Sequence, residues 1–503
     1  MKVRMTNRIV QIGRDSTWYL IAQAGYALMG LVSIPILTRV FSPSQYGIYS
    51  LVSITIVLVT PIFYISFTTS LIRFFPEYEK KGDLQTLYST GLRYIPHFLA
   101  ATLLIALPIA AFALPLGDSR TVVCLGIAIF ALFVPFFIML TLFQVNQKAA
   151  QYAMLFLIVY AGRYLVGAAL AKWAGTGVNG IFIAWLGALL LVIPLELILL
   201  RIPGKFRWHR YSPRLMKEFF SYGFVLIFVN ISVNILTSAD RYMVQAFRGS
   251  AEVGLYSVVY TLVVDAFSIM LWAIQLGAAP VVMKTFENDG EAATQTLLSQ
   301  LTRYLLILLI PSSIGLYLLR VRIISVLTSA KYLPSTKAVL PLVLGIFLYN
   351  LAWVPTYAFY VRKRTKLTLI PVVTAAIVNI GLNFWLIPKY GFAAAAWNTM
   401  IAYLVYIVIL VSLTERLLHW EFPFKEAFKV LAASVVMGVG VFFLNKVHIH
   451  GIGALILMIV VGGAIYIAAL VAFRGISRKE FEFARKTISR VLSRALPPKS
   501  END

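Results

Sequence analysis

Hydrophobic positions in this chain fall in long unbroken runs, and polar positions gather in short segments between them. Roughly 20 apolar residues are needed for a helix to cross a bilayer core about 30 Å thick. The runs reach that length and lack the period-two alternation of barrel strands. We therefore predict an all-α integral membrane protein with about 14 transmembrane helices. These helices are expected to begin near residues 16, 47, 94, 121, 152, 178, 219, 254, 304, 338, 367, 391, 429 and 452.

The composition supports lipid as the solvent of this chain. Hydrophobic residues make up 60% of the sequence and charged residues only 13%. A soluble domain is less apolar and carries about 25% charged residues. A soluble fold could not bury this excess of apolar residues, because its surface is in contact with water.

The net charge of +24 is distributed in a way that predicts topology. If there are 14 spans, the loops on the N-terminal side hold 32 of the 44 Lys and Arg residues, and the opposite side holds 11. Positive loops stay in the cytoplasm. We therefore predict a multi-pass protein of the cytoplasmic (inner) membrane with both termini inside. Because the basic residues lie between spans, we expect no nucleic-acid partner.

A repeated motif divides the chain into two halves. Residues 41–50 and 247–257 both read Phe, a polar turn, then Gly-aliphatic-Tyr-Ser, and a weaker echo links 177–180 to 391–394. Two bundles of six helices would share one orientation, related by a pseudo-twofold axis along the membrane normal. The expected parts are a basic N-terminus (1–15), an N-terminal bundle (16–202), a cytoplasmic linker (203–218), a C-terminal bundle (219–414), two extra helices (428–473) and a basic cytoplasmic tail (474–503). The tail fits either a helix on the membrane surface or a solvated segment.

Enzyme motifs are missing from the sequence. It contains no Gly-x-x-x-x-Gly-Lys-Ser/Thr loop, no His-Glu-x-x-His and no Gly-x-Ser-x-Gly. Cys124 is the single cysteine, so neither an intrachain disulfide nor a cysteine metal site is expected. We predict a protein that is not an enzyme and needs no cofactor. Coupling to an ion or proton gradient stays open.

Charges inside the spans are the strongest candidates for function, because each costs several kcal/mol unless it is paired or wet. Arg163 lies near the middle of the fifth span and Asp265 near the middle of the eighth. Asp265 shares a polar stripe at helical spacing with Thr261, Ser268 and Trp272. One interpretation is that Arg163 binds an anionic cargo and Asp265 a cation or proton in a central cavity. The other is that the two residues pair as a structural tie.

A second polar group lies at span ends and along the seventh span. Arg39 ends the first span and Arg73 the second. The seventh span carries a polar face, which favours cavity lining over lipid contact, although interface anchoring also explains the terminal arginines. This face comprises Asn230, Asn234, Thr237 and Arg241, with Asp240 adjacent.

Three segments carry a family resemblance. They are Pro35-Ile-Leu-Thr-Arg-Val-Phe-Ser-Pro-Ser-Gln-Tyr-Gly-Ile-Tyr49, Asp240-Arg-Tyr242 followed by Val253-Gly-Leu-Tyr-Ser257, and Tyr390-Gly-Phe-Ala-Ala-Ala395. From about Asp15 to Thr414, the chain resembles bacterial polysaccharide biosynthesis proteins. These are oligosaccharidyl-lipid flippases of the O-antigen type, within the multidrug/oligosaccharidyl-lipid/polysaccharide exporter superfamily. Arg39, Arg73, Asp240 and Arg241 match charged positions of that family.

The resemblance implies alternating access and a polyprenyl-diphosphate-linked oligosaccharide as cargo for surface polysaccharide such as lipopolysaccharide or exopolysaccharide. It implies membrane lipids as surroundings, and leaves open a polysaccharide polymerase and glycosyltransferases as partners. A multidrug/cation antiporter of the same superfamily, a membrane-embedded polymerase and a scaffold of an assembly complex are the alternatives.

The first prediction tests the topology. The charge asymmetry predicts that alkaline phosphatase fused to the C-terminus is inactive, whereas a cytoplasmic fluorescent protein at the same place is bright. Fusions after Gly391, in a predicted outer loop, serve as the control and should show the opposite pattern. High phosphatase activity at the C-terminus would mean an odd number of spans.

Overall fold

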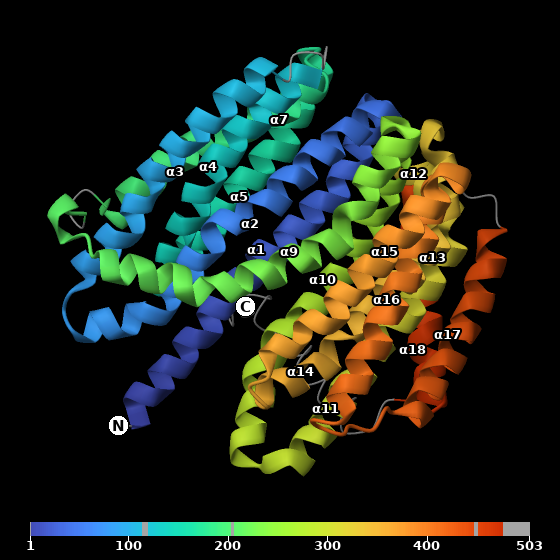
Figure 1. Ribbon diagram of the computed structural model, residues 1–503. Helices are drawn as coiled ribbons and strands as arrows, with labels where there is room; N and C mark the ends of the chain where they lie inside the picture. The colour runs from blue at the N-terminus through green and yellow to red at the C-terminus, as the bar shows by residue number, and fades with distance from the viewer. Residues whose placement is uncertain (1, 113–118, 203–205, 447–450, 476–503) are drawn as a thin grey trace, which may run out of the picture.

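The computed structural model describes residues 2–112, 119–202, 206–446 and 451–475, and this part of the chain is helical with no strand. Figure 1 shows the N-terminal helices on the left and most of the C-terminal ones on the right. The N-terminal half contains α1 (Lys2–Val40), α2 (Pro43–Lys80), α3 (Leu84–Phe112), α4 (Ser119–Val145), α5 (Ala149–Ala161), a π-helical turn η2 (Gly162–Val166), α6 (Gly167–Trp173), α7 (Val178–Leu200) and the short η3 (Trp208–Arg210).

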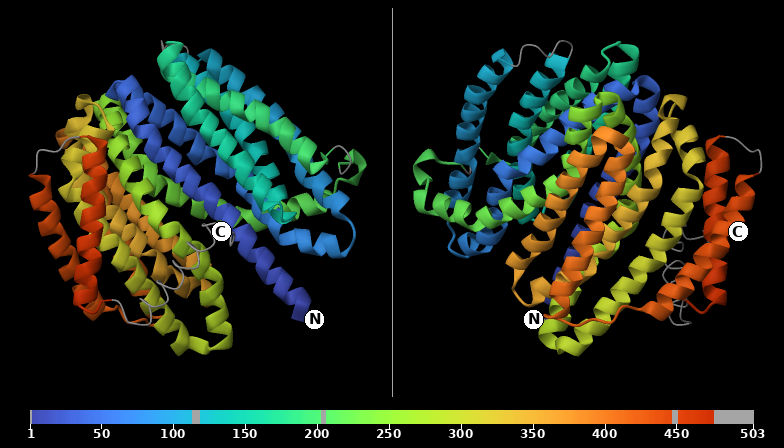
Figure 2. Two further views of the ribbon diagram at one scale, coloured as in Figure 1. Left: turned by 180° about the vertical axis from the view of Figure 1, so that it is seen from behind. Right: turned by 45° about the vertical axis from the view of Figure 1, so that its right-hand side comes forward.

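The C-terminal half contains the remaining helices. These are α9 (Pro213–Arg248), α10 (Ser250–Asn288), α11 (Gly290–Leu318), α12 (Arg320–Leu327), η4 (Ala330–Ala338), α13 (Val339–Leu351), α14 (Trp353–Val361), η5 (Thr365–Thr368), α15 (Leu369–Tyr390), α16 (Phe392–Glu415), α17 (Phe424–Asn445) and α18 (Ile452–Ala472). In all views α17 and α18 lie at the outer edge of this half, away from the N-terminal helices (Figures 1 and 2).

The predicted all-α membrane fold is confirmed. Within the described residues, 13 helical segments are long and apolar enough to cross a membrane. They agree with 13 of the 14 predicted spans. The remaining prediction falls on α3, a 29-residue helix whose side chains beyond Ile105 lie outside the described residues.

Several predicted boundaries differ from the structure. Helix α1 begins at Lys2, so the basic N-terminus continues the first span as a helix, whereas we expected a separate segment. Helix α9 begins at Pro213 inside the predicted linker, and α17 begins at Phe424, four residues early. Proline at the first helical position, already fixed in φ, explains the early start of α9. The predicted tail helix lies outside the described residues.

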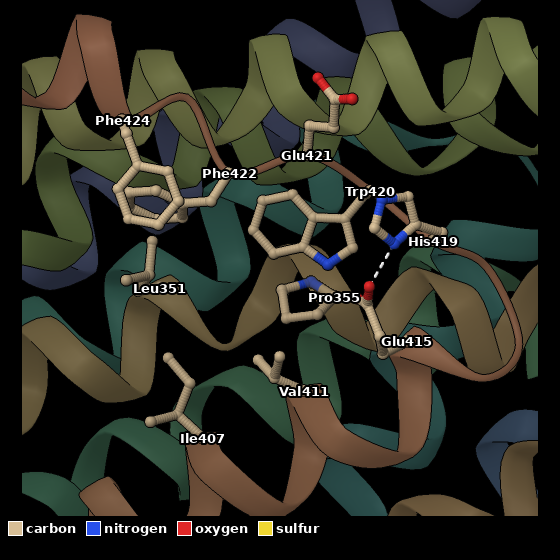
Figure 3. A pocket seen from close by; sticks show the side chains of 10 residues that line it. All are labelled: Leu351, Pro355, Ile407, Val411, Glu415, His419, Trp420, Glu421, Phe422 and Phe424. Carbon is tan, nitrogen blue, oxygen red and sulfur yellow. Dashed lines mark hydrogen bonds and ion pairs between the residues drawn. The ribbon is translucent and has the colours of Figure 1, made fainter.

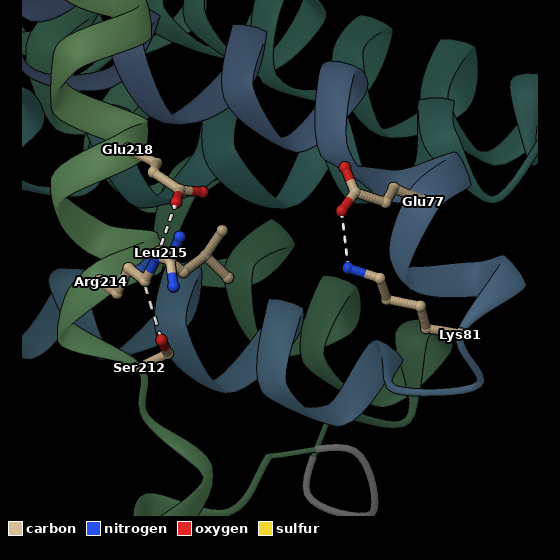
Figure 4. A network of polar contacts seen from close by, with 6 residues as sticks. All are labelled: Glu77, Lys81, Ser212, Arg214, Leu215 and Glu218. Atoms are coloured by element: carbon tan, nitrogen blue, oxygen red, sulfur yellow. Dashed lines mark hydrogen bonds and ion pairs between the residues drawn. The ribbon is translucent and has the colours of Figure 1, made fainter.

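Local sequence fixes where α2 and α9 begin. The Ser42 hydroxyl accepts from the Gln45 backbone N–H while the Gln45 side chain accepts from the Ser42 N–H, forming a capping box before Pro43. Ser212 caps α9 in the same manner by accepting from the Leu215 N–H. Figure 4 shows this cap beside the surface ion pairs that lie at the same end of the molecule, Arg214–Glu218 and Glu77–Lys81.

Helices α2 and α10 make the most extensive helix contact in the described chain, and two glycines make it possible. A Cβ atom on Gly47 would overlap the Ser250 carbonyl oxygen, and one on Gly254 would overlap the Pro43 carbonyl oxygen. The contact is reciprocal, as a twofold axis between the two helices requires. These are the glycines of the repeated motif, so the repeat places the closest backbone approach between the halves.

Further hydrogen bonds join the halves at the same end. The Ser44 and Ser250 hydroxyls lie 2.9 Å apart, and the Tyr332 hydroxyl donates to the Phe41 carbonyl at 3.1 Å. The Arg39 guanidinium donates to the Val326 carbonyl at 3.1 Å. We refer to this set of contacts around Gly47 and Gly254 as the crossing. It lies at the predicted outer side.

The second prediction concerns the crossing. Replacing Gly254→Ala should lower the melting temperature in detergent, because the added methyl group overlaps backbone that cannot move aside as a side chain can; overpacking of this kind costs about 1–3 kcal/mol. Gly277→Ala, in the same helix but with no atom within 4 Å of the added carbon, is the matched control. It should be neutral or slightly stabilising, because alanine favours helix. Equal melting of both variants would contradict the tight contact.

Candidate functional site

Arg163 lies in an irregular turn of the fifth span. The π-helical turn η2 separates α5 from α6 and carries Arg163 at its second residue. Glycines on either side let this segment pack on α7: a Cβ on Gly162 would be 2.9 Å from that of Ala188, and one on Gly167 would be 2.9 Å from the Ile181 Cα. Such π-turns frequently occur at functional sites. Here the turn aims Arg163 at the space between α2 and α7.

Aromatic and hydroxyl groups surround the Arg163 guanidinium, and no carboxylate pairs with it among the residues that the structure describes. The side chain is 4% exposed. Its Nη2 donates to the Tyr49 hydroxyl at 3.0 Å and to the Ser53 hydroxyl at 2.9 Å. Its central carbon lies 3.9 Å from the Trp185 ring centroid and 4.9 Å from that of Tyr164. Cation–π contacts and two hydrogen bonds compensate for part of the buried charge, while the Nε donor has no hydrogen-bond partner among the described atoms.

The pairing interpretation does not hold in this conformation. No ion pair joins Arg163 to Asp265 among the described residues. Tyr26 of α1 is within electrostatic range of both charges. Arg163 is also covered, so it does not line an open cavity here. Its role as a cargo ligand stays a prediction.

Asp265 lies at the contact between α10 and α1. Its carboxylate packs directly over Gly30, where a Cβ atom would overlap it. The side chain is half-buried, as are Thr261 and Ser268 on the predicted stripe. The Trp272 side chain lies outside the described residues. Asp265 thus faces α1 at the junction of the two halves, and the absence of a side chain at Gly30 makes room for its carboxylate.

Asp240 and Arg241 are both buried but have different surroundings. Asp240 is 1% exposed, and its carboxylate accepts from the Tyr256 and Thr399 hydroxyls, which ties α9 to α10 and α16. The Arg241 guanidinium lies 4.0 Å from the Tyr260 ring centroid. Both halves therefore hold a buried arginine against aromatic rings.

Asparagines form two local ladders. The Asn234 amide donates to the Asn230 side-chain oxygen at 2.7 Å along α9. The Asn383 amide donates to Asn379 at 2.9 Å, and that of Asn398 donates to Asn383 at 3.0 Å, linking α15 to α16. Asn230 and Asn234 are half-buried, whereas the second ladder is buried.

The span-end arginines occupy opposite ends of the molecule. Arg39 belongs to the crossing. Arg73 is exposed on α2 near the other end, with its guanidinium 5.9 Å from the Phe74 ring centroid. The structure does not bring Arg39, Arg73, Arg163 and Arg241 together into one cluster of contacts.

An apolar groove of about 490 Å³ runs between α10, α11, α17 and α18. Its lining is almost entirely apolar, with aliphatic, methionine and aromatic side chains. The central lining residues are Phe267, Pro311, Gly315, Met437, Gly462 and Tyr466.

Sequence reasoning missed the partners of the buried charges. Tyr49 belongs to the repeated motif and Ser53 lies one turn further along α2, so their shared polar face could have been recognised in the sequence. Nothing in the sequence singles out Trp185, since an aromatic residue in an apolar span is ordinary.

Several known proteins are similar to this chain in sequence. A family model described as polysaccharide biosynthesis protein matches residues 12–286. An uncharacterized membrane protein of Methanocaldococcus jannaschii is 23% identical over 51% of this chain, and a probable lipid II flippase MurJ of Thermotoga maritima is 25% identical over 59%. The alignments span 50% and 59% of those relatives.

Solved structures show the same fold. A lipid II flippase MurJ in an inward closed conformation has a TM-score of 0.70 at 18% identity, covering 90% of this chain and 98% of that one. An inward-facing multidrug resistance MATE family transporter has a TM-score of 0.67 at 11% identity, covering 78% and 94%. The chain is therefore a multi-pass membrane protein with the helical architecture of these transporters.

The third prediction separates the two interpretations of Arg163. Arg163→Ala should destabilise the fold by roughly 2–4 kcal/mol, because it leaves a cavity and removes the donor to two buried hydroxyls. The double variant Arg163→Ala, Asp265→Ala should be no more stable, because the two residues are not paired. Thermal unfolding in detergent measures both. Lys172→Ala, exposed at the end of α6, is the control. Recovery in the double variant would restore the pairing interpretation.

Proposed function

Because the chain belongs to the polysaccharide biosynthesis protein family, we propose that it is a flippase for polyprenyl-diphosphate-linked oligosaccharide. It would turn this cargo across the cytoplasmic membrane for surface polysaccharide synthesis by alternating access. The observation that carries the proposal is the crossing, which joins two helix bundles at one end through reciprocal glycines. Two bodies that meet in this way close the path at the outer end, and separation of the crossing would open that end while the other end closes.

The chemistry of the cargo fits the side chains of the molecule. A diphosphate needs permanent cations and hydrogen-bond donors, and arginine supplies both. Arg73 is exposed near the predicted cytoplasmic end, where the cargo would bind first. Arg163 and Arg241 would bind the diphosphate once movement of the halves exposes them. The apolar groove beside α10 suits an isoprenoid chain, which can stay in the bilayer while the polar head crosses.

Asp265 is the proposed coupling group. Its carboxylate lies against α1 at the junction of the halves, so its charge bears on the contact that must change during transport. Uptake of a proton or a cation there would remove an uncompensated charge from the interface. We propose an ion or proton gradient as the energy source, with no cofactor.

The second candidate is a multidrug/cation antiporter, favoured by the likeness to a multidrug transporter fold. Among the buried and half-buried candidate residues, Arg163 and Arg241 match Asp240 and Asp265 in number, so their charge alone does not choose between an anionic and a cationic cargo. The match to the polysaccharide biosynthesis family favours the lipid-linked glycan. A polymerase would need a large outer loop with catalytic groups, and the segment 319–337 is taken up by α12 and η4. We further propose cytoplasmic termini and an association with a polysaccharide polymerase and glycosyltransferases.

The fourth prediction tests cargo class. In proteoliposomes, the purified protein should expose a fluorescent polyprenyl-diphosphate oligosaccharide to an impermeant quencher, and should not move a lipophilic cationic dye. Arg73→Ala should slow the lipid-linked glycan on the order of tenfold, because a hydrogen bond to a charged group is worth about 1.5–3 kcal/mol. Lys80→Ala, two turns further along the same helix, should transport normally.

Two outcomes would overturn the proposal. Dye movement without glycan movement would favour the antiporter. If the glycan moves no faster in vesicles that contain the protein than in empty vesicles, the scaffold alternative is favoured. Restored surface polysaccharide in a flippase-deficient strain is the matching test in cells.

A further inference from the structure

A second hollow, chemically unlike the apolar groove, lies where α11, α17 and α18 reach the predicted cytoplasmic side. Its volume is about 690 Å³. The lining is polar and charged, and comes from α11, from the loop before α17, and from the segment after α18. We call it the basic pocket; it is lined by Thr296, Ser299, Gln300, Arg303, Glu421, Phe422, Pro423, Phe424, Lys425, Glu426, Lys429, Arg474 and Gly475.

Cations outnumber carboxylates in the basic pocket. Arg303, Lys425, Lys429 and Arg474 face two acidic residues, Glu421 and Glu426. The N-terminus of α17, a helix of 22 residues, adds to the positive side, since Pro423 at its N-cap provides no side-chain hydrogen bond. Backbone N–H groups at such an end favour an anion, above all a phosphate.

Hydrogen bonds fix the walls of the basic pocket. The Arg303 guanidinium donates to the Gly475 carbonyl at 2.8 Å, which holds the end of α18 against α11. The Ser299 hydroxyl donates to the Glu421 carbonyl at 2.5 Å, which holds the loop. One turn deeper, the Tyr466 hydroxyl donates to the Ile307 carbonyl at 2.8 Å. These hydrogen bonds hold together the three segments that carry the cations.

The basic pocket opens beside an apolar surface. Phe424 and Phe428, one turn apart on α17, are 75% and 72% exposed, and each precedes a pocket lysine in sequence. A neighbouring hollow of about 630 Å³ shares Glu421, Phe422 and Phe424 with the pocket. Figure 3 shows these residues next to aliphatic side chains such as Leu351 and Ile407. Cationic groups thus lie directly beside apolar surface, the arrangement of a lipid–water interface.

We propose that the basic pocket binds the phosphate headgroup of an anionic phospholipid from the cytoplasmic leaflet, with the acyl chains lying along Phe424, Phe428 and the neighbouring apolar hollow. Basic pockets between transmembrane helices on this side of a membrane bind such headgroups. A resident lipid fits better than the cargo, because α17 and α18 lie at the outer edge, far from the crossing (Figures 1 and 2). The proposal does not depend on which cargo is transported.

The fifth prediction is a lipid-binding measurement on the full chain. Native mass spectrometry in detergent with added phosphatidylglycerol should show saturable binding, and phosphatidylcholine should bind weakly. Lys425→Gln, Lys429→Gln together should weaken phosphatidylglycerol binding by about fivefold per lysine, from about 1 kcal/mol for each cation near the surface. Lys425→Arg, Lys429→Arg should bind normally, because the charge is kept.

Control variants and competitors complete the test. Lys446→Gln, just beyond the opposite end of α17, should leave binding unchanged. If the double glutamine variant does not remain folded by size-exclusion chromatography, each single variant is measured instead. Unchanged phosphatidylglycerol binding in the folded variants would overturn the proposal. Displacement of the lipid by millimolar inorganic phosphate would make it a site for a soluble anion, and preferential binding of a polyprenyl diphosphate would make it a cargo site. Either result would reject a resident phospholipid.

Discussion

The architecture depends on one steric constraint, the backbone contact of α2 with α10. Neither Gly47 nor Gly254 can carry a side chain, because each faces a carbonyl of the other helix. Small residues let transmembrane helices approach closely and gain packing energy that lipid does not otherwise provide. The remaining contacts at this end, from Ser44 to Tyr332, follow from that approach. Since the contact is built from the repeated motif, duplication of one sequence element supplies both sides of the junction.

Buried arginines are the second organising feature. A cation within the membrane must find compensation, and carboxylates are scarce in this chain. Arg163 and Arg241 each lie against aromatic rings, at 3.9 Å from Trp185 and 4.0 Å from Tyr260. Arg163 is compensated by rings and hydroxyl groups, whereas Arg241 also has the buried carboxylate of its neighbour Asp240 within electrostatic range. Such a cation stays available to a diphosphate when the halves separate, which links the static structure to the proposed cargo.

Much of the fold was predictable because a membrane span requires a long run of apolar residues, which is visible in the sequence. The spans followed from run length and the two halves from the repeat, whereas the glycine contact between the halves was seen only in the structure. The start of α1 at Lys2 and the early start of α9 were not predicted, because polar residues can form helix outside the bilayer. The contacts of the candidate residues were not predicted. The position of Arg163 and Asp265 near the middle of a span indicates that burying their charges costs free energy. Their neighbours, however, come from helices distant in sequence. A single sequence does not indicate that Trp185 lies against Arg163 or that Gly30 lies beneath Asp265.

The central claim is that the crossing must open for cargo to pass, and a reversible cross-link tests it most directly. The Ser44 and Ser250 hydroxyls are 2.9 Å apart, so Ser44→Cys and Ser250→Cys together, with Cys124→Ser, place two thiols within bonding reach. Oxidation should stop movement of lipid-linked glycan in proteoliposomes, and a reductant should restore it, while each single cysteine variant stays active under both conditions. Glycan movement at an unchanged rate in fully cross-linked protein would contradict alternating access through this junction.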